Sequence, residues 1–347
     1  MEPSLLAPRF LARLADPSIV TVLLAGCGGG FDFVHAAALY PDLVRMGKRV
    51  VWVSYSFGDP ARIGGEAPVV FERDGAVVKR VTARSIPDGH YGPEVHLAGF
   101  LDERFPERAP HGLLACNARR FTVPALRAFY RRLAREQNVD AAVIVDGGSD
   151  SLMRGDEEGL GDPIEDAVSV TALADLHEIR ERLLVTVGLG CDRFNQVSDA
   201  ASLRAIAELT AAGGFLGAVA LHEGSPAFAF YRDALDHLDA RQPFRSVLSG
   251  AVISAGEGRF GRDEVPERLQ KRVREGELFL WPLMAMLWGF DVRAVAARSL
   301  IAGWIREQTT VLGCHAALQD GRFALGAGLR DVEELPRHVE MRARRFE

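Results

Sequence analysis

The chain has few cysteines, no apolar run long enough to cross a membrane, and no excess of basic residues. Its 347 residues include four cysteines, Cys27, Cys116, Cys191 and Cys314. No two of them have the CxxC spacing of redox or zinc motifs, so we expect reduced thiols and a cytoplasmic protein. The net charge of −6 argues against nucleic acid or an anionic membrane as a partner, because both bind basic surfaces.

The stretch nearest to a membrane span covers 279–288, whereas a spanning helix needs about 18 apolar residues. Glu277 and Asp291 flank this stretch, so we predict a buried helix instead. No basic and then apolar segment opens the chain, and we therefore expect no secretory signal. The basic run at 337–345 is short and contains Glu340, which favours a solvated tail over a nucleic-acid arm.

The most informative feature that is present is a repeated junction. Four apolar runs, each typical of a buried strand, end abruptly in glycines and polar residues at 25–32, 146–151, 188–195 and 222–225. In an open parallel α/β sheet, ligands bind in the crevice outside the carboxyl ends of the strands. The four loops therefore predict one shared site for a small molecule.

The alternation of strand-like and helical patterns predicts a three-layer α/β fold, Rossmann-like, with a mainly parallel sheet. Strands are expected at 19–25, 49–54, 141–145, 183–187 and 215–221, and helices at 5–14, 33–46, 123–137, 164–180, 200–212 and 226–238. We expect the whole chain, 1–347, to form a single domain.

Two regions depart from this alternation. An insertion at 56–120 contains the pair Asp74-Gly75, which predicts a hairpin, and we expect the insertion to roof part of the site. After residue 240 the strand signal fades, so a helical C-terminal layer is expected over 240–347. Its helices are predicted at 265–275, 279–288 and 292–311.

The first glycine-rich loop does not fit the usual dinucleotide fingerprint. G-x-G-x-x-G needs a small residue at its third position, where this chain has Phe31. The second strand ends in 54–56, Ser-Tyr-Ser, without the acid that holds a ribose. Standard NAD binding is therefore disfavoured. The bare amides of Gly28, Gly29 and Gly30 favour an anionic ligand at a helix start.

Asp32 in the same loop argues against an anionic ligand, because a carboxylate repels phosphate. It is suited to accept hydrogen bonds from ligand hydroxyls or an amine, or to cap the following helix. Both roles stay open.

The second loop is dense in carboxylates. Asp146 and Asp150 are predicted as general acid and base and as candidate ligands for Mg²⁺ or Ca²⁺, with Ser149 binding substrate. Their spacing does not match the calcium loop D-x-[DN]-x-[DN]-G, and ordinary turn chemistry is the alternative. Glu157 and Glu158, further along, are expected to face solvent.

The third and fourth loops add further candidates. Asp192 and Asn195 are predicted to bind substrate. His222 is the one histidine of nine at the carboxyl end of a predicted strand, so it is the candidate general base, with Glu223 beside it binding substrate. Cys27 and Cys191 follow strands, where a thiol pKa can fall, but small residues filling tight loops are the preferred interpretation.

Three ordered motifs, at 25–32, 146–157 and 188–192, resemble the family called domain of unknown function 1152. The resemblance covers most of the chain and implies a prokaryotic, cytoplasmic α/β protein. It carries no family activity, so the site assignments rest on the residues themselves.

The residues favour an enzyme, a hydrolase or transferase, acting on a small polar metabolite that bears hydroxyls, an amine or a sugar-like group. An NAD(P)-dependent oxidoreductase and a non-catalytic ligand sensor remain alternatives. We also expect a homodimer, because apolar residues concentrate at 281–288 and Trp304 follows on the helix predicted at 292–311.

Overall fold

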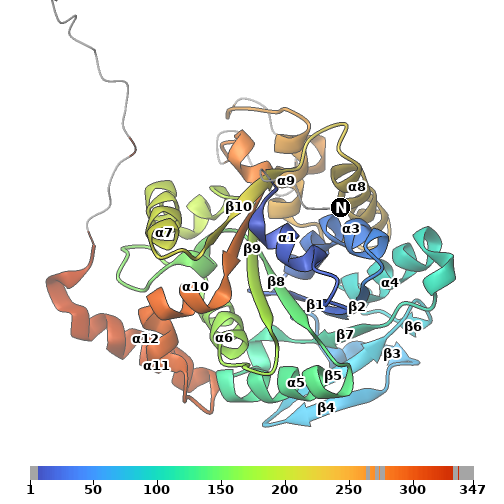
Figure 1. Cartoon of the computed structure of the whole chain (residues 1–347), viewed down its shortest axis with the longest axis horizontal. Coiled ribbons are helices and arrows are strands. Elements are labelled where there is room, and N and C mark those ends of the chain that lie inside the picture. Colours follow the sequence, from blue (N-terminus) through green and yellow to red (C-terminus); the bar gives the residue numbers. More distant parts are fainter. Residues whose placement is uncertain (1–6, 263–265, 270–272, 274–277, 331–334, 336–347) are drawn as a thin grey trace, which may run out of the picture.

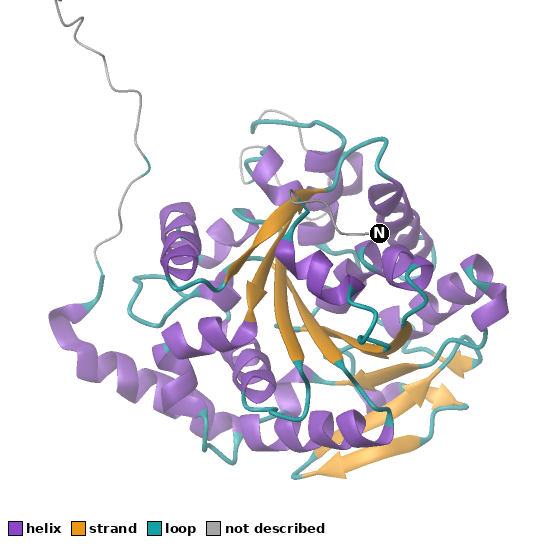
Figure 2. Cartoon of the chain, viewed as in Figure 1, coloured by secondary structure: helices purple, strands orange, loops and turns teal. Residues whose placement is uncertain are grey.

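The computed structural model describes residues 7–262, 266–269, 273, 278–330 and 335. Within these residues, helices cover both faces of one large sheet, in three layers (Figure 1 and Figure 2). The predicted three-layer α/β fold with a mainly parallel sheet is therefore confirmed.

The sheet has nine strands within the described residues, in the order β10-β11-β9-β8-β1-β2-β7-β5-β4. Its strands are β1 (Thr21–Gly26), β2 (Arg49–Val53), β4 (Val69–Arg73), β5 (Ala76–Val81), β7 (Leu113–Cys116), β8 (Ala141–Gly147), β9 (Glu181–Val187), β10 (Phe215–Ala220) and β11 (Met286–Asp291). Neighbours from β9 to β7 pair in parallel. The hairpin β4–β5 and strand β11 pair antiparallel. Two short strands, β3 (Gly64–Gly65) and β6 (Ser85–Ile86), pair separately.

Strand β1 shows why the sheet is buried on both faces. All six of its residues are buried, and successive side chains point to opposite faces. Leu23 and Ala25 join the core on one face, while Val22 and Leu24 join the core on the other. Such a strand has no polar face, which is typical of a parallel sheet covered by helices on both sides.

The helices divide between these two cores. The face of Val22 is covered by α1 (Arg9–Ala15), α2 (Asp32–His35), α3 (Tyr40–Arg45), α4 (Pro93–Arg104), α8 (Pro226–Asp239) and α9 (Val247–Gly256). The face of Leu23 is covered by α5 (Val123–Glu136), α6 (Pro163–Ala174), α7 (Asp199–Ala211), α10 (Val292–Arg298), α11 (Leu300–Ile305) and α12 (Val311–Leu325). The helices are therefore distributed over both faces of the sheet.

The connections define where a ligand site belongs. From β1 the chain adds β2 on one side, and after β7 it returns to place β8 on the other side of β1. The loops that follow β1 and β8 consequently run in opposite directions away from one crevice. Such a switch point is where open α/β sheets bind ligands.

The C-terminal layer differs from the prediction. The prediction of a helix at 279–288 is wrong. Pro282–Ala285 form a 3-10 turn, and Met286–Asp291 form β11, which lies between β10 and β9 in the sheet. The single helix expected at 292–311 is divided into α10 and α11, followed by α12. The helix predicted at 265–275 and the basic tail at 337–345 lie mostly or wholly outside the described residues.

Two further expectations need correction. The predicted helix 33–46 is three short pieces, α2, a 3-10 turn at Ala36–Ala38, and α3. The insertion 56–120 contains the predicted hairpin but also α4 and β7, and it extends the main sheet beyond β2. It is therefore part of the fold's framework.

Trp304, the aromatic anchor expected at a dimer interface, is partly buried against its own chain. The ring of Trp304 packs so closely on Gly321 and Gly155 that a Cβ at Gly321 would lie 2.3 Å from it. Trp304 therefore joins α11 to α12 and to the loop after β8. No helix within the described residues has the length and apolar character that crossing a membrane requires.

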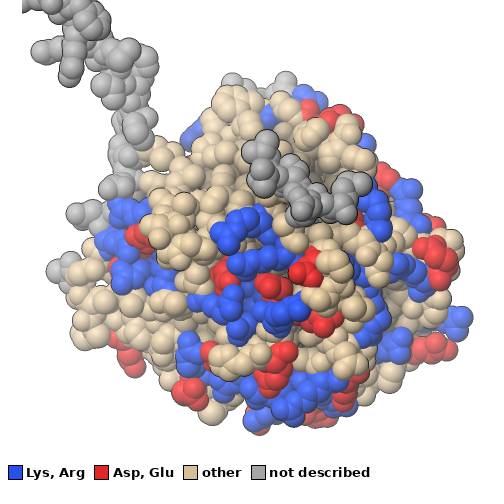
Figure 3. All heavy atoms as spheres, viewed as in Figure 1, with Lys and Arg blue, Asp and Glu red and all other residues tan. Residues whose placement is uncertain are grey.

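Charges of both signs are interspersed on the face seen in Figure 3, where basic side chains gather near the middle with acidic ones among them. Many arginines of the chain are held in ion pairs. Arg13, for example, lies 3.1 Å from Asp291 and 3.5 Å from Glu181. Such pairing neutralises much of the local basic charge.

Candidate functional site

A cavity of about 490 Å³ opens at the switch point of the sheet. The loops after β1, β8 and β9 and the start of α6 form its polar floor, and the segment before α9 closes one side. Six aspartates line it: Asp32, Asp146, Asp150, Asp162, Asp166 and Asp192. Among the described residues, no Lys or Arg lines the cavity. The site is therefore strongly acidic.

Eight of the eleven predicted site residues line this cavity. They are Gly28, Gly29, Gly30, Asp32, Asp146, Asp150, Asp192 and Asn195. Ser149 lies just behind the lining, where its amide donates to Asp192 at 2.7 Å and its hydroxyl contacts Ser202 at 2.9 Å. Ser149 thus positions an aspartate instead of facing a ligand.

His222 and Glu223 are not brought to the cavity. His222 is exposed, and its Nδ1 lies 2.8 Å from the carbonyl of Glu223, whose carboxylate pairs with Arg232. The reason is β11, which separates β10 from β9. Neighbouring strands lie about 4.8 Å apart, so β10 ends roughly 14 Å from β8. The general-base prediction for His222 is therefore not supported by its position.

His35, which the sequence did not single out, is the histidine that lines the cavity. It is 1% exposed, and its Nδ1 lies 2.7 Å from the hydroxyl of Tyr231 on α8. A Cβ at Gly147 would lie 2.6 Å from its Nε2, so that nitrogen borders the loop after β8. Burial lowers the pKa of His35 to about 3, and the ring is neutral at physiological pH.

Asp32 joins the first two loops. Its Oδ2 accepts a hydrogen bond from the amide of Gly28 at 2.6 Å, and its Oδ1 accepts one from the amide of Gly147 at 3.1 Å. The Gly28 amide, which was expected to bind an anionic ligand, thus already donates its hydrogen bond to the carboxylate of Asp32. The helix that follows has only four residues. An anion-binding loop is consequently not supported here.

Asp166 is a second residue that the sequence did not single out. It lies in the first turn of α6, a helix whose residues are almost all buried. Its side chain is 3% exposed, and its Oδ1 has no hydrogen-bond partner. A Cβ at Gly28 would lie 2.5 Å from both carboxylate oxygens. Glycine at this position is therefore needed so that the carboxylate can approach the loop after β1.

The other aspartates are held by hydrogen bonds from the loops. Asp146 accepts one from the hydroxyl of Ser151, and Asp150 accepts one from the amide of Asp162 at 3.1 Å. The Oδ2 of Asp192 accepts the amide of Ser149 described above, and a Cβ at Gly148 would lie 2.4 Å from that oxygen. The glycines of these loops thus make room for carboxylates.

Burial and mutual repulsion disfavour the ionised forms of these groups. Burial is the larger cause, and neighbouring carboxylates add to it, so that the pKa values of Asp146, Asp150, Asp166 and Asp192 lie well above the usual range. Burial also raises the pKa of Asp32 to about 7. Without a positive charge in the cavity, not all five groups can be ionised together at neutral pH.

Three of the carboxylates come close enough to share an ion. One oxygen each from Asp32, Asp146 and Asp166 lie within 4.8 Å of one another. Asp146 was a predicted metal candidate, whereas Asp150, the other candidate, is outside this group. Oxygen ligands of this kind suit Mg²⁺, Ca²⁺ or Mn²⁺.

The rim of the cavity is aromatic. Phe31, Phe57, Phe194 and Phe244 line it, and Phe194 and Phe244 are 63% and 41% exposed. Phe57 belongs to the insertion, as expected for a roof, and Arg119 lies 4.0 Å above its ring. The cavity therefore combines an acidic floor with apolar walls.

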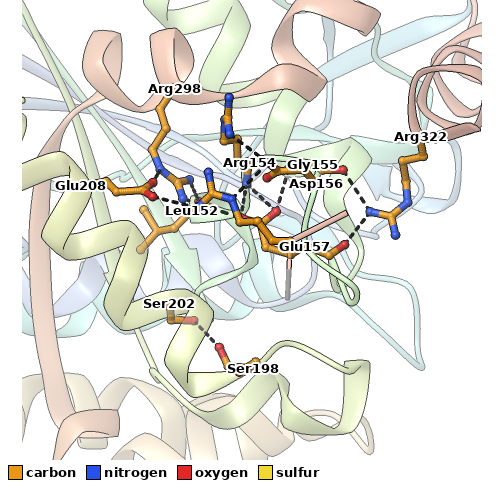
Figure 4. A network of polar contacts seen from close by, with 11 residues as sticks. Leu152, Arg154, Gly155, Asp156, Glu157, Ser198, Ser202, Glu208, Arg298 and Arg322 are labelled. Carbon is orange, nitrogen blue, oxygen red and sulfur yellow. Dashed lines mark hydrogen bonds and ion pairs between the residues drawn. The ribbon is translucent and has the colours of Figure 1, made fainter. Parts of the chain in front are cut away.

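The loop after β8 is fixed by the C-terminal layer (Figure 4). Arg298 on α10 donates to the carbonyl of Leu152 at 2.6 Å, and Arg322 on α12 donates to the carbonyls of Gly155 and Glu157 at 3.0 and 2.8 Å. Glu157 is itself buried and accepts the amide of Gly155 at 2.8 Å, so its predicted exposure is wrong. Glu158 is exposed as predicted.

Neither loop cysteine lines the cavity. Both Cys27 and Cys191 are buried, and burial raises their pKa values, so the thiols stay protonated. The interpretation of both as small residues that fill tight loops fits this environment.

The fold and cavity define a class: an α/β protein with an acidic cavity at the switch point of its sheet. A family model described as "Protein of unknown function (DUF1152)" matches residues 122–323, more than half of the chain. The chain therefore belongs to the DUF1152 family. The matched segment includes the loops after β8 and β9 and the start of α6. No curated protein and no solved structure matches the chain.

Proposed function

We propose that this protein is an enzyme that hydrolyses or transfers a group of a small polar metabolite in the aspartate-lined cavity. One observation carries the proposal: six aspartates from the end of β8, from the segments after β1, β8 and β9 and from the start of α6 line a single cavity, which no described Lys or Arg lines. Keeping so many buried carboxylates together costs stability. Active sites are the places where such perturbed groups cluster.

The lining indicates the ligand's chemistry. Carboxylates accept hydrogen bonds from hydroxyls and amines, so the polar part of the ligand carries such donors. The exposed rings of Phe194 and Phe244 offer flat apolar surfaces to a sugar or a heterocycle. A cavity of about 490 Å³ accommodates a molecule of nucleoside or small-sugar size.

Asp150 and His35 are the proposed proton carriers. One oxygen of Asp150 is engaged by the amide of Asp162, which leaves the other for a substrate or water. His35 is neutral and is oriented by Tyr231, so its Nε2 accepts a proton, while burial raises the pKa of Asp150 and keeps a proton available for donation. In hydrolysis, His35 would accept a proton from the attacking water, and the carboxyl of Asp150 would donate a proton to the leaving group.

Two features argue against the nicotinamide alternative. The bulky Phe31 stands at the third position of the fingerprint, and Asp32 already accepts the Gly28 amide. A non-catalytic sensor would bind its ligand without converting it, so a measurement of turnover distinguishes the sensor from an enzyme.

The experiment incubates the purified protein with a metabolite extract and follows consumed and formed species by mass spectrometry. The wild type should convert at least one hydroxyl- or amine-bearing compound. Asp150→Asn should lower the rate at least 100-fold, and the exposed control Glu158→Gln should leave it unchanged. Ligand binding without any turnover in the wild type would identify a sensor, and turnover that survives Asp150→Asn would remove that residue from the mechanism.

A further inference from the structure

Three carboxylates meet at one point of the cavity floor although they come from three different elements. Asp32 opens α2, Asp146 lies near the end of β8, and Asp166 lies in the first turn of α6. Oxygens of the three lie within 4.8 Å of one another. Asp32 and Asp146 are each fixed by hydrogen bonds from the loops, so their positions do not depend on a ligand.

Asp166 supplies an independent sign that this point receives a ligand. Its Oδ1 is fully buried and has no partner in the described structure, although the residue is 3% exposed. A buried, unpaired carboxylate oxygen is costly. Asp166 lines the cavity, and a Cβ at Gly28 would lie 2.5 Å from this oxygen. Gly28 thus leaves space for the carboxylate of Asp166, and no described residue donates a hydrogen bond to its Oδ1.

We propose that Asp32, Asp146 and Asp166 bind one divalent cation that prefers oxygen ligands, of the Mg²⁺ or Mn²⁺ type. Three negative charges in a buried place call for more than one positive charge, which favours a divalent ion over an ammonium group. Mg²⁺ and Mn²⁺ take six oxygen ligands and commonly keep several waters. The remaining positions face the cavity and are available to water and to an oxygen of the substrate.

The cation deepens the proposed function but is tested without it. A bound divalent ion polarises a substrate oxygen or activates a water, which suits hydrolysis or group transfer. It also compensates the negative floor, so that a ligand need not be cationic. The binding of the ion itself requires no substrate.

The experiment titrates Mn²⁺ and Mg²⁺ into the full chain after chelator treatment, by calorimetry and by the electron paramagnetic resonance of free Mn²⁺. One saturable site is expected in the wild type. Asp166→Asn should weaken Mn²⁺ binding at least tenfold, since even outer-shell partners of a metal change affinity 10- to 100-fold. The control Glu158→Gln, an exposed acid of a nearby loop, should bind within about threefold of the wild type.

Two measurements locate the ion and separate the hypotheses. Crystals soaked in Mn²⁺ should show an anomalous peak between the three carboxylates, and urea unfolding in chelator should show that Asp166→Asn is folded. No binding by the wild type at millimolar Mn²⁺, or equal binding by Asp166→Asn, would overturn the cation site. Metabolite turnover by a wild type that binds no Mn²⁺ would overturn the cation site while supporting the proposed function, whereas Mn²⁺ binding that Asp166→Asn abolishes, without turnover, would support the cation site alone.

Discussion

Replacing Asp166 by asparagine should stabilise the protein when divalent cations are absent. The carboxylate oxygens of Asp32, Asp146 and Asp166 lie within 4.8 Å of one another. At an effective dielectric constant of about 20, two unit charges at this distance repel by about 3.5 kcal/mol. Proton uptake relieves part of this repulsion. We therefore expect Asp166→Asn to raise the free energy of unfolding by about 1–3 kcal/mol at pH 8 in chelator.

The effect should depend on pH with a defined sign. Burial and the neighbouring carboxylates raise the folded-state pKa of Asp166 above its usual value. The folded protein then holds more protons than the unfolded chain, so stability falls as pH rises from about 3.8 through the folded pKa. Asparagine does not titrate. The advantage of Asp166→Asn should therefore be small near pH 4 and grow toward pH 8.

The assay is urea unfolding followed by tryptophan fluorescence, in chelator at pH 4.5 and pH 8, compared at equal m-values. Saturating Mn²⁺ should reverse the order, because an ion at a hundredfold excess over its dissociation constant stabilises the wild type by about 2.7 kcal/mol. If Asp166→Asn instead destabilises the metal-free protein equally at both pH values, the carboxylate is a structural group and the electrostatic reasoning is refuted.

Three further predictions follow from the same geometry. Gly28→Ala places a Cβ 2.5 Å from the carboxylate of Asp166, so it should weaken Mn²⁺ binding at least tenfold in calorimetry and cost about 1–3 kcal/mol in urea unfolding; unchanged binding would contradict the close approach. His35→Gln should lower turnover at least 100-fold while His222→Gln leaves it unchanged, and the reverse order would restore the original assignment. The homodimer remains a prediction. Phe323 on α12 is 90% exposed, so Phe323→Asp should reduce the mass measured by light scattering from that of a dimer to the monomer mass of 37.8 kDa. A monomeric wild type would contradict the prediction.

The fold class was predictable because the central strands carry their signal locally. β1 and β8 are mostly apolar runs that end in glycine, and the alternation of such runs with helical patterns indicates a mainly parallel sheet. β11 was not predictable in the same way. It is mostly buried, and its first residues, 286–288, end the apolar run at 279–288. Short apolar runs do not distinguish a strand from a buried helix. Only its pairing with β9 and β10 makes it a strand.

This one strand also explains why His222 lies away from the cavity. His222 was chosen because it follows a predicted strand, and it does follow β10. The distance of His222 from the switch point depends on the order of the strands in the sheet, in which β11 lies between β10 and β9. The sequence pattern does not specify that order. His35, in contrast, was not predicted but lies at the cavity. It belongs to an apolar helical pattern, where a histidine is ordinarily a core residue. The packing of α2 against β8 and α8 brings it to the cavity.

The glycine-rich loops show how one pattern supports two opposite sites. Bare amides at a helix start are typical of anion binding, and the sequence around Gly28 fits that interpretation. The structure places Asp32 on the Gly28 amide and Asp166 against the Gly28 Cα. The absent side chain therefore creates space for a carboxylate, and the loop becomes part of an acidic floor. Which charge a glycine loop accepts is decided by the residues packed against it, and here one of those residues comes from a helix that begins 135 residues later in the chain.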